Sequence, residues 1–188
     1  MDFSRFQPLF DIIEKELKKR ERTVLAIDGA AASGKTTLAA LIAEKYGAEI
    51  VHMDDFFLPR ERKTEVRLAE PDGNIDRERF AEEVLMHVNY CAPFSYGIYN
   101  CGKGKIDGTA QVGAAKLVIV EGVYSLSPHF RAHYDIKIML TVEMETQLVR
   151  LRERCADWQY ESFLNIWLPL EARYFSLCGI EGACDMVF

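Results

Sequence analysis

Residues 27–37 read IDGAAASGKTT and contain the spacing G-x-x-x-x-G-K-[ST]. Gly29 and Gly34 lack a Cβ atom, so the backbone there can approach a bound group closely. The N–H groups of such a loop point inward and the following helix adds positive potential, so together they can hold a polyphosphate. The residues expected to bind the nucleotide are Gly29, Ala30, Ala31, Ala32, Ser33, Gly34, Lys35, Thr36 and Thr37.

Two side chains at the end of this loop would complete a phosphate-donor site. Lys35 supplies a mobile positive charge at the β- and γ-phosphates and counts as a catalytic residue, while the Thr36 hydroxyl can ligate Mg²⁺. An apolar strand before the loop and a helix after it provide the context that the motif requires. The sequence therefore predicts ATP and Mg²⁺ as cofactors. A regulatory GTPase would also carry N-K-x-D and D-x-x-G, and neither string occurs.

Carboxylates follow two further apolar runs. Asp54 and Asp55 lie in MDDFFLP, where Asp54 could orient an acceptor hydroxyl, accept its proton and touch the metal shell. Asp55 is expected only to cap the next loop. Glu121 comes directly after LVIV, as in a Walker-B segment, and could hold Mg²⁺. The alternative for Glu121 is a strand-end carboxylate that bonds to the phosphate loop. His52, in the strand before Asp54, is expected to pack.

Two arginines could close over the phosphates. Arg150 and Arg154 are four residues apart and so share one face of the helix predicted over 143–155. There they could stabilise the charge of a phosphoryl group in transfer, as part of a lid. The alternative is an ordinary solvated face.

These groups require a scaffold of alternating strands and helices, which is the pattern of a parallel α/β sheet. Strands are expected over 23–28, 49–55, 115–122, 135–142 and 184–188. Helices are expected over 6–20, 35–46, 76–88, 143–155 and 160–175, the last with a bend or break at Pro169. A short helix is expected over 127–134. We expect one domain over 1–188, with an N-terminal helix in 1–20 and the lid helix in 143–155. Residues 56–74 are expected to form a long loop, and residues 93–112 a hairpin or loop outside the main sheet; both would cover the acceptor.

Taken together, GAAASGKTT, MDDFF and VIVEGVY resemble the uridine kinase-like family of P-loop kinases, over about residues 23–154. That group includes kinases for uridine, nicotinamide riboside, pantothenate and phosphoribulose. The resemblance implies a three-layer P-loop NTPase fold with a five-stranded parallel sheet and ATP–Mg²⁺ as phosphate donor. It also implies a small-molecule acceptor with a primary hydroxyl. By motif, Asp54 matches the general base, Thr36 and Glu121 the magnesium neighbourhood, and Arg150 a lid arginine.

The resemblance also suggests substrate-binding residues. Asp76 aligns with a carboxylate that binds ribose hydroxyls in related riboside kinases, although it could equally cap the helix at 76–88. Tyr96 and Tyr99 lie where the family flanks a base with aromatic rings, although they could instead pack a hairpin against the sheet. Ala69 and Glu70 depart from the uridine kinase pattern, so the acceptor is a nucleoside or a similar riboside rather than uridine in particular. The competing function is a P-loop nucleotide-binding protein with regulatory or weak ATPase activity.

Composition limits the other partners. The net charge is −6 and the only basic run, at 18–22, closes a helix, so nucleic acid is not expected as a partner. No run is long enough to span a membrane, and no signal peptide is visible. Five cysteines without C-x-x-C spacing favour reduced thiols and a cytoplasmic protein. The aromatic helix over 160–175 could pack against a twin, so a homodimer is a further expectation.

Overall fold

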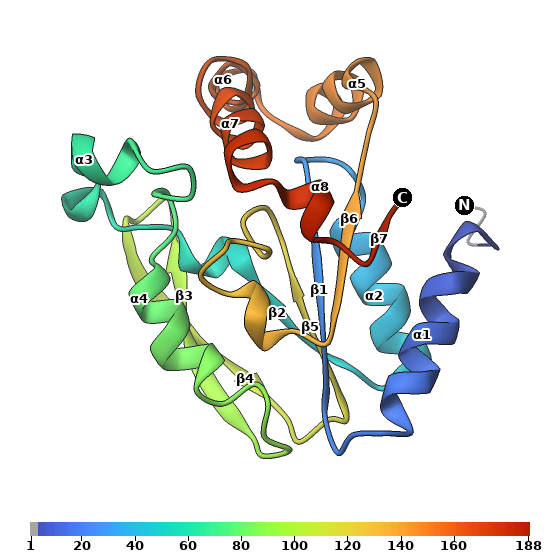
Figure 1. The fold of residues 1–188 in the computed structure, drawn as a ribbon. Coiled ribbons are helices and arrows are strands. Elements are labelled where there is room, and N and C mark those ends of the chain that lie inside the picture. Colours follow the sequence, from blue (N-terminus) through green and yellow to red (C-terminus); the bar gives the residue numbers. More distant parts are fainter. Residues whose placement is uncertain (1–3) are drawn as a thin grey trace.

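The computed structural model describes residues 4–188, and a five-stranded parallel sheet with the order β2-β5-β1-β6-β7 forms its centre. The strands are β1 (Thr23–Gly29), β2 (Glu49–His52), β5 (Leu117–Glu121), β6 (Ile136–Leu140) and β7 (Met186–Val187). Because β1 pairs with both β5 and β6, the loop after β1 lies at the middle of one edge of the sheet (Figure 1). The predicted parallel sheet is confirmed, including the last strand expected over 184–188.

Successive side chains of β1 face two separate hydrophobic cores, as the period of two in a strand requires. Leu25 and Ile27 pack under α1 (Gln7–Leu17) and α2 (Lys35–Tyr46), and Val24 and Ala26 belong to the core on the opposite face. The opposite core contains Phe56, Phe80, Val84, Phe94, Tyr96, Phe130, Tyr134 and Tyr174. All seven residues of β1 are buried because both faces of the sheet are covered. The three-layer α/β architecture is therefore confirmed.

Helix α2 is set by glycine at both ends. It begins at Lys35, after Gly34 with a φ of 101°, and ends before Gly47 with a φ of 64°. Both angles lie in the region that glycine adopts without steric cost. The expected bounds of this helix, 35–46, are confirmed, and its first turn carries the end of the phosphate loop.

The segment after β2 is more ordered than the sequence predicts. Residues 53–55, expected to continue the strand, instead lie in a 3₁₀ turn (Met53–Phe56). Residues 56–74, expected as a plain loop, contain a 3₁₀ turn (Arg60–Arg62) and α3 (Glu65–Leu68), whose N-terminus is capped by the Thr64 side chain. Helix α4 (Arg77–Phe80) follows and continues as a π-helical turn (Ala81–Leu85) rather than as α-helix to residue 88.

An antiparallel hairpin stands beside the main sheet, as one of the two forms predicted for residues 93–112. It consists of β3 (Phe94–Asn100) and β4 (Lys105–Val112), with an irregular register between Gly97 and Tyr99. Figure 1 shows the hairpin and α4 together on one side of the sheet. The short helix expected over 127–134 is reduced to a 3₁₀ turn (Arg131–His133).

Three helices stand over the end of the sheet where the phosphate loop lies (Figure 1). They are α5 (Met144–Arg154), α6 (Asp157–Ser162) and α7 (Leu168–Cys178), with a π-helical turn (Phe163–Trp167) between α6 and α7. Pro169 lies in the first turn of α7, directly after the π-helical turn, within a run that is helical from residue 157 to residue 178. No break occurs at Pro169; the α-helical pattern changes only in the π-helical turn before it, and α8 (Ile180–Ala183) leads on to β7.

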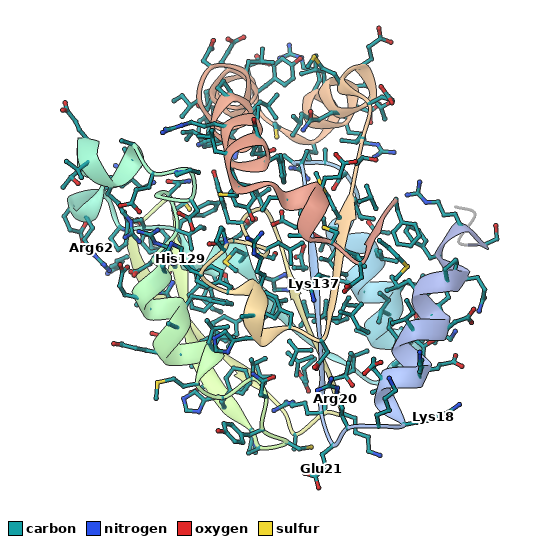
Figure 2. The ribbon with its side chains drawn as sticks, viewed as in Figure 1. Lys18, Arg20, Glu21, Arg62, His129 and Lys137 are labelled. Carbon is teal, nitrogen blue, oxygen red and sulfur yellow. The ribbon has the colours of Figure 1, made fainter. Side chains whose placement is uncertain are left out.

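Lys18, Arg20 and Glu21, from the basic run, lie at the opposite end of the sheet from these three helices (Figure 2). Within residues 4–188, no helix has the length and apolar character needed to cross a membrane.

Candidate active site

The phosphate loop is held against the neighbouring strand. A Cβ atom at Gly29 would lie 2.2 Å from the backbone oxygen of Leu140, and the φ of Gly29 is 141°. Only glycine fits here, because any side chain would collide with backbone that cannot move aside. Ala32, further along the loop, has a φ of 59°, which an alanine seldom adopts. The loop is therefore held in a strained, tightly packed form.

The polar groups of this loop fit a bound anion. Lys35 is buried, and its Nζ donates to the carbonyl oxygens of Gly29 at 2.8 Å and Ala30 at 2.9 Å. The Ser33 hydroxyl is also buried, yet among residues 4–188 it has no hydrogen-bond partner. An unpaired buried hydroxyl is costly, and a phosphate oxygen would satisfy it. These residues thus suit the nucleotide phosphates that the sequence motif predicts.

Thr36, Glu121 and His52 form a chain of contacts across two strands. The Thr36 hydroxyl donates to both carboxylate oxygens of Glu121 at 3.3 Å, and His52 Nδ1 lies 2.6 Å from Glu121 Oε1. This hydrogen bond raises the pKa of His52, which favours its charged form. A hydroxyl and a carboxylate are ligands that Mg²⁺ prefers. The packing role expected for His52 is wrong, because its side chain is partly exposed and paired with Glu121.

Asp54 lies at the head of the 3₁₀ turn after β2 and its side chain is accessible to solvent. The surrounding protein nevertheless desolvates its carboxylate and raises its pKa, while the charge of Lys35 acts in the opposite direction and that of Glu121 adds to the rise. Lys35, Glu121 and Asp54 therefore act on one another electrostatically. The structure brings together the residues predicted for the phosphate, the metal and the proton.

Asp55 has a different environment from Asp54. Burial raises the pKa of Asp55, and a hydrogen bond from the Tyr96 hydroxyl opposes that rise. The same hydroxyl accepts from the backbone N–H of His52 at 3.4 Å. Tyr96 is buried and its ring packs against Phe56 with centroids 5.1 Å apart. Tyr96 thus joins the hairpin to the turn that carries Asp54.

Three side chains from the helices above the sheet contact the phosphate loop. Gln147 on α5 donates to the Ala31 carbonyl at 2.9 Å, and Arg150 donates to the Ala32 carbonyl at 2.9 Å. Glu171 on α7 accepts from the Ala31 N–H at 2.9 Å. The peptide groups on both sides of Ala31 are therefore fixed by α5 and α7.

Arg154 is not brought to the loop, unlike Arg150. Its guanidinium lies 5.8 Å from the centroid of the Phe163 ring, in the π-helical turn. Gln147 and Glu171, which sequence reasoning did not select as site residues, contact the loop instead. Neither belongs to a recognisable motif, so only the packing of α5 and α7 reveals them.

A buried carboxylate lies directly beneath the loop. Asp28, the residue before Gly29, accepts from the N–H groups of Gly29 at 2.7 Å and Leu126 at 2.8 Å, and from the Tyr174 hydroxyl at 2.7 Å. Burial raises its pKa to about 6. Sequence reasoning also missed Asp28. The available signal was a carboxylate near the end of an apolar strand, directly before the first glycine of the phosphate loop. It ties β1 to α7 and to the turn after β5.

On the acceptor side, Asp76 is buried and fully engaged. Its carboxylate accepts from the Arg79 N–H at 3.2 Å, as a helix N-cap, and from Arg62 at 2.6 Å. The capping alternative is thus confirmed, and ribose binding by Asp76 stays a prediction. Figure 2 shows Arg62 at the outer side of this segment. Tyr99 is buried in the hairpin, where the Arg60 backbone N–H bonds to its hydroxyl.

Arg79 connects three elements of the acceptor side. Its guanidinium donates to the backbone oxygens of Asp55 and Gly97, pairs with Glu83 and lies 4.2 Å from the centroid of the Phe56 ring. The turn that holds Asp54, the hairpin and α4 are therefore joined by one side chain.

Comparison with known proteins gives a consistent result. The chain is 24% identical over 169 residues to a uridine kinase of Clostridium perfringens, covering 80% of this chain and 79% of that protein. It is 25% identical over 161 residues to a uridine kinase of Latilactobacillus sakei, covering 79% of this chain and 74% of that protein. No family model matches the chain.

Solved structures share the fold. A candidate uridine kinase from Bacillus stearothermophilus superimposes with a TM-score of 0.68 at 21% identity, covering 97% of this chain and all (100%) of that one. A D-glycerate 3-kinase from Cryptococcus neoformans gives a TM-score of 0.66 at 15% identity, with 91% and 88% covered. A candidate fructose transport system kinase from a Silicibacter species gives 0.60 at 28% identity, with 89% of each chain covered.

Proposed function

We propose that this chain, which resembles the uridine kinase-like P-loop kinases in both sequence and fold, transfers the γ-phosphate of ATP to a hydroxyl of a nucleoside or riboside-like small molecule. The observation that supports it best is the position of Asp54. Asp54 follows His52 by two residues, and His52 lies opposite Glu121, at the predicted metal position; the charges of Lys35 and Glu121 both act on the Asp54 carboxylate. A base is useful in phosphoryl transfer only at such a junction.

In this proposal, the acceptor oxygen forms a bond to the γ-phosphorus while the bond from that phosphorus to the β,γ-bridging oxygen breaks, which leaves ADP. The hydroxyl proton passes to the Asp54 carboxylate, whose raised pKa suits it to receive a proton. Bound Mg²⁺ would neutralise charge on the β- and γ-phosphate oxygens, with Thr36 and Glu121 as its protein neighbours. Lys35 would leave the carbonyls of Gly29 and Ala30 to contact the transferred group.

The helices above the sheet would supply the remaining positive charge. Arg150 already donates to the Ala32 carbonyl, at the top of the phosphate loop. A small rearrangement of its guanidinium would bring it to the γ-phosphate, where it stabilises the charge that spreads over the oxygens in transfer. Arg154 would need a larger movement of α5, because its guanidinium lies over Phe163.

Asp54→Asn tests this proposal, with Asp55→Asn as the matched control. Turnover with ATP–Mg²⁺ and each of a panel of nucleosides and ribosides is followed through ADP release. We expect Asp54→Asn to lower kcat about 10²- to 10⁴-fold with little change in ATP affinity, since a general base contributes about that much. Asp55→Asn should lower kcat less than about 10-fold. Equal effects of the two substitutions would contradict the role of Asp54.

The acceptor requirement tests the reaction type itself. A kinase should release ADP in step with phosphorylation of one acceptor, detected as phosphorylated product by mass spectrometry. ADP release at the same rate with and without every acceptor would instead indicate a nucleotide-binding protein with weak ATPase activity.

A further inference from the structure

A cavity lies between the end of α7, α8 and the start of β6. Its volume is about 690 Å³, which is within the range of about 300–1,000 Å³ that small-molecule sites occupy. Two cations, Arg131 and Lys137, line this cavity, and no residue of 4–188 that lines it is acidic. The other lining residues are small or apolar, among them Pro128, Ala132 and Gly182. The cavity therefore combines positive charge with an uncharged surface.

This cavity is separate from the phosphate loop. Lys137 is the second residue of β6 and pairs with Ala26, in the middle of β1. The phosphate loop begins at Gly29, which pairs with Leu140 at the other end of β6. Three residues of strand, about 10 Å, separate position 137 from position 140. Figure 2 shows Lys137 beside α8, below the three helices that stand over the phosphate loop.

A lysine is unexpected at this position of the sheet. Ile136 and Ile138, its neighbours in β6, pack in the core under α1 and α2, so Lys137 points to the opposite face, which is also covered. The Lys137 ammonium lies 3.6 Å from a carboxylate oxygen of Asp185, which is long for a hydrogen bond. The same oxygen accepts from the Lys137 backbone N–H at 2.7 Å. The ammonium therefore keeps donors for another partner.

Arg131 is the second cation of the cavity, and it forms no ion pair with another residue of 4–188. Its guanidinium donates to the backbone oxygen of Cys178, the last residue of α7, at 3.4 Å. This is one long hydrogen bond for a group with five N–H donors. The planar fork of a guanidinium matches the oxygens of a phosphate, and such hydrogen bonds between charged groups are strong. Both cations are half-buried and lack a close anionic partner.

Helix α7 connects this cavity to the phosphate loop. Cys178 lines the cavity at the end of the helix. One turn earlier, the Tyr174 hydroxyl donates to Asp28 at 2.7 Å, directly beneath the loop. Two turns earlier, Glu171 accepts from the Ala31 N–H at 2.9 Å. A ligand that restrains the end of α7 therefore acts on the element that holds the loop.

We propose that this cavity binds a small phosphate monoester whose phosphate contacts Arg131 and Lys137, and that this ligand strengthens nucleotide binding by restraining α7. A phosphate monoester carries about −1.5 to −2 charge at pH 7, which two cations match. Its uncharged part would lie on the small residues of the cavity, whereas a bare phosphate ion would leave most of the volume unfilled. The inference needs a nucleotide at the phosphate loop but does not depend on the proposed acceptor or on phosphoryl transfer.

The site can be tested by nuclear magnetic resonance with phenyl phosphate as the probe. The full chain is labelled with ¹⁵N-glycine, and its phosphate loop is first occupied by Mg²⁺ and a non-hydrolysable ATP analogue. The amide signals of Gly179 and Gly182 report on the cavity, and those of Gly29 and Gly34 report on the phosphate loop. We expect phenyl phosphate to shift the first pair with a dissociation constant of roughly 1–10 mM, as is usual for a ligand of this size.

Two partial probes separate the contributions of charge and apolar surface. Phenol has the ring without the phosphate, and inorganic phosphate has the charge without the ring. Each should bind at the cavity at least about 5-fold more weakly than phenyl phosphate, since each loses one kind of contact. No shift of Gly179 and Gly182 with phenyl phosphate, or equal binding of phenol, would overturn the site.

Substitutions assign the charge. Arg131→Gln and Lys137→Gln should each weaken phenyl phosphate about 5-fold or more, and Arg131→Lys should weaken it less than Arg131→Gln. The matched control is Lys105→Gln, which removes the same charge from an exposed position on β4 and should leave the binding unchanged. The glycine signals outside the cavity show whether each variant is folded. Binding that survives in folded Arg131→Gln and Lys137→Gln alike would contradict recognition by these cations.

The connection through α7 has its own test. Calorimetry measures the affinity for the ATP analogue with Mg²⁺, with and without phenyl phosphate. We expect the analogue to bind about 5-fold more tightly with phenyl phosphate present, and the analogue should tighten phenyl phosphate by the same factor. The variant with both Arg131→Gln and Lys137→Gln should lose this effect. Weaker nucleotide binding in both proteins would indicate competition at the phosphate loop and overturn the connection. An unchanged affinity, with Gly182 still shifted, would overturn the connection and leave a second ligand site.

Discussion

Glu171 places a carboxylate against the phosphate loop, which is expected to bind anionic phosphates. The substitution Glu171→Gln tests how the charge of this carboxylate affects stability. The side chain is buried on α7 and accepts from the N–H of Ala31 at 2.9 Å. Burial raises its pKa to about 7 from the ordinary value of 4.5, although the Ala31 N–H opposes the rise. Glu171→Gln keeps an oxygen that can accept this hydrogen bond and removes the charge.

The magnitude follows from these two pKa values. A carboxyl whose pKa is raised on folding is neutral in the native state and ionised in the unfolded state between pH 4.5 and about 7. The native state then binds more protons, so the free energy of unfolding falls as pH rises through that window. At about 1.4 kcal/mol for each pH unit between the two values, the loss above pH 7 is about 3 kcal/mol. Glu171→Gln avoids this loss.

We therefore expect Glu171→Gln to unfold with nearly the wild-type free energy at pH 4 and with a gain of about 3 kcal/mol at pH 8. The assay is urea unfolding, monitored by far-UV circular dichroism at several pH values. The comparison requires that the free energy of unfolding depends on urea concentration with the same slope in both proteins. Glu145→Gln on α5, an exposed position, is the control and should show no such trend. A gain that is absent at pH 8, or equal at both pH values, would refute the reasoning.

Three further predictions concern neighbouring residues. Gly29→Ala should destabilise the fold by about 2–5 kcal/mol in urea unfolding, because the new Cβ meets the Leu140 oxygen in a backbone conformation that alanine avoids; an unchanged midpoint would contradict this. Gln147→Leu leaves the Ala31 carbonyl without its buried donor. The melting temperature should therefore fall by an amount equivalent to about 1–3 kcal/mol, and ATP should bind more weakly in calorimetry. An unchanged melting temperature and an unchanged ATP affinity would mean that this hydrogen bond does not hold the phosphate loop. His52→Gln should lower the free energy of unfolding in urea by about 0.5 kcal/mol at pH 6 and by less at pH 9. The raised pKa of His52 means that its ion pair with Glu121 stabilises the fold only while the ring is protonated, and partial exposure screens that pair. A larger loss at pH 9 than at pH 6 would contradict the ion pair.

Elements whose signals are local were predictable from the sequence. The bounds of α2 follow from Gly34 and Gly47, and the buried strands β1 and β5 follow from short runs of β-branched and aliphatic residues. The cap of α4 follows from Asp76. The segment 56–74 was not predictable in the same way, because its order comes from ion pairs such as Arg67 with Glu78 and not from hydrophobic periodicity.

The missed site residues depend on contacts between distant parts of the chain. Glu171 and Ala31 are 140 positions apart, and Gln147 and Ala31 are 116 apart. The sequence predicts His52 as a packing residue because it does not reveal the strand order. In the structure, β2 pairs with β5 in a register that sets His52 opposite Glu121. Once that order is known, the pairing of the histidine with the carboxylate follows directly.

The contacts of Arg79 have a consequence for selectivity. Because one guanidinium holds both the Gly97 carbonyl in the hairpin and the Asp55 carbonyl beside Asp54, an acceptor of the proposed kinase that displaces the hairpin would also displace the proposed base. An ill-fitting compound would then be bound and yet react slowly. Discrimination among acceptors would appear in kcat more than in KM, so that competing hydroxyl compounds act as inhibitors without becoming products.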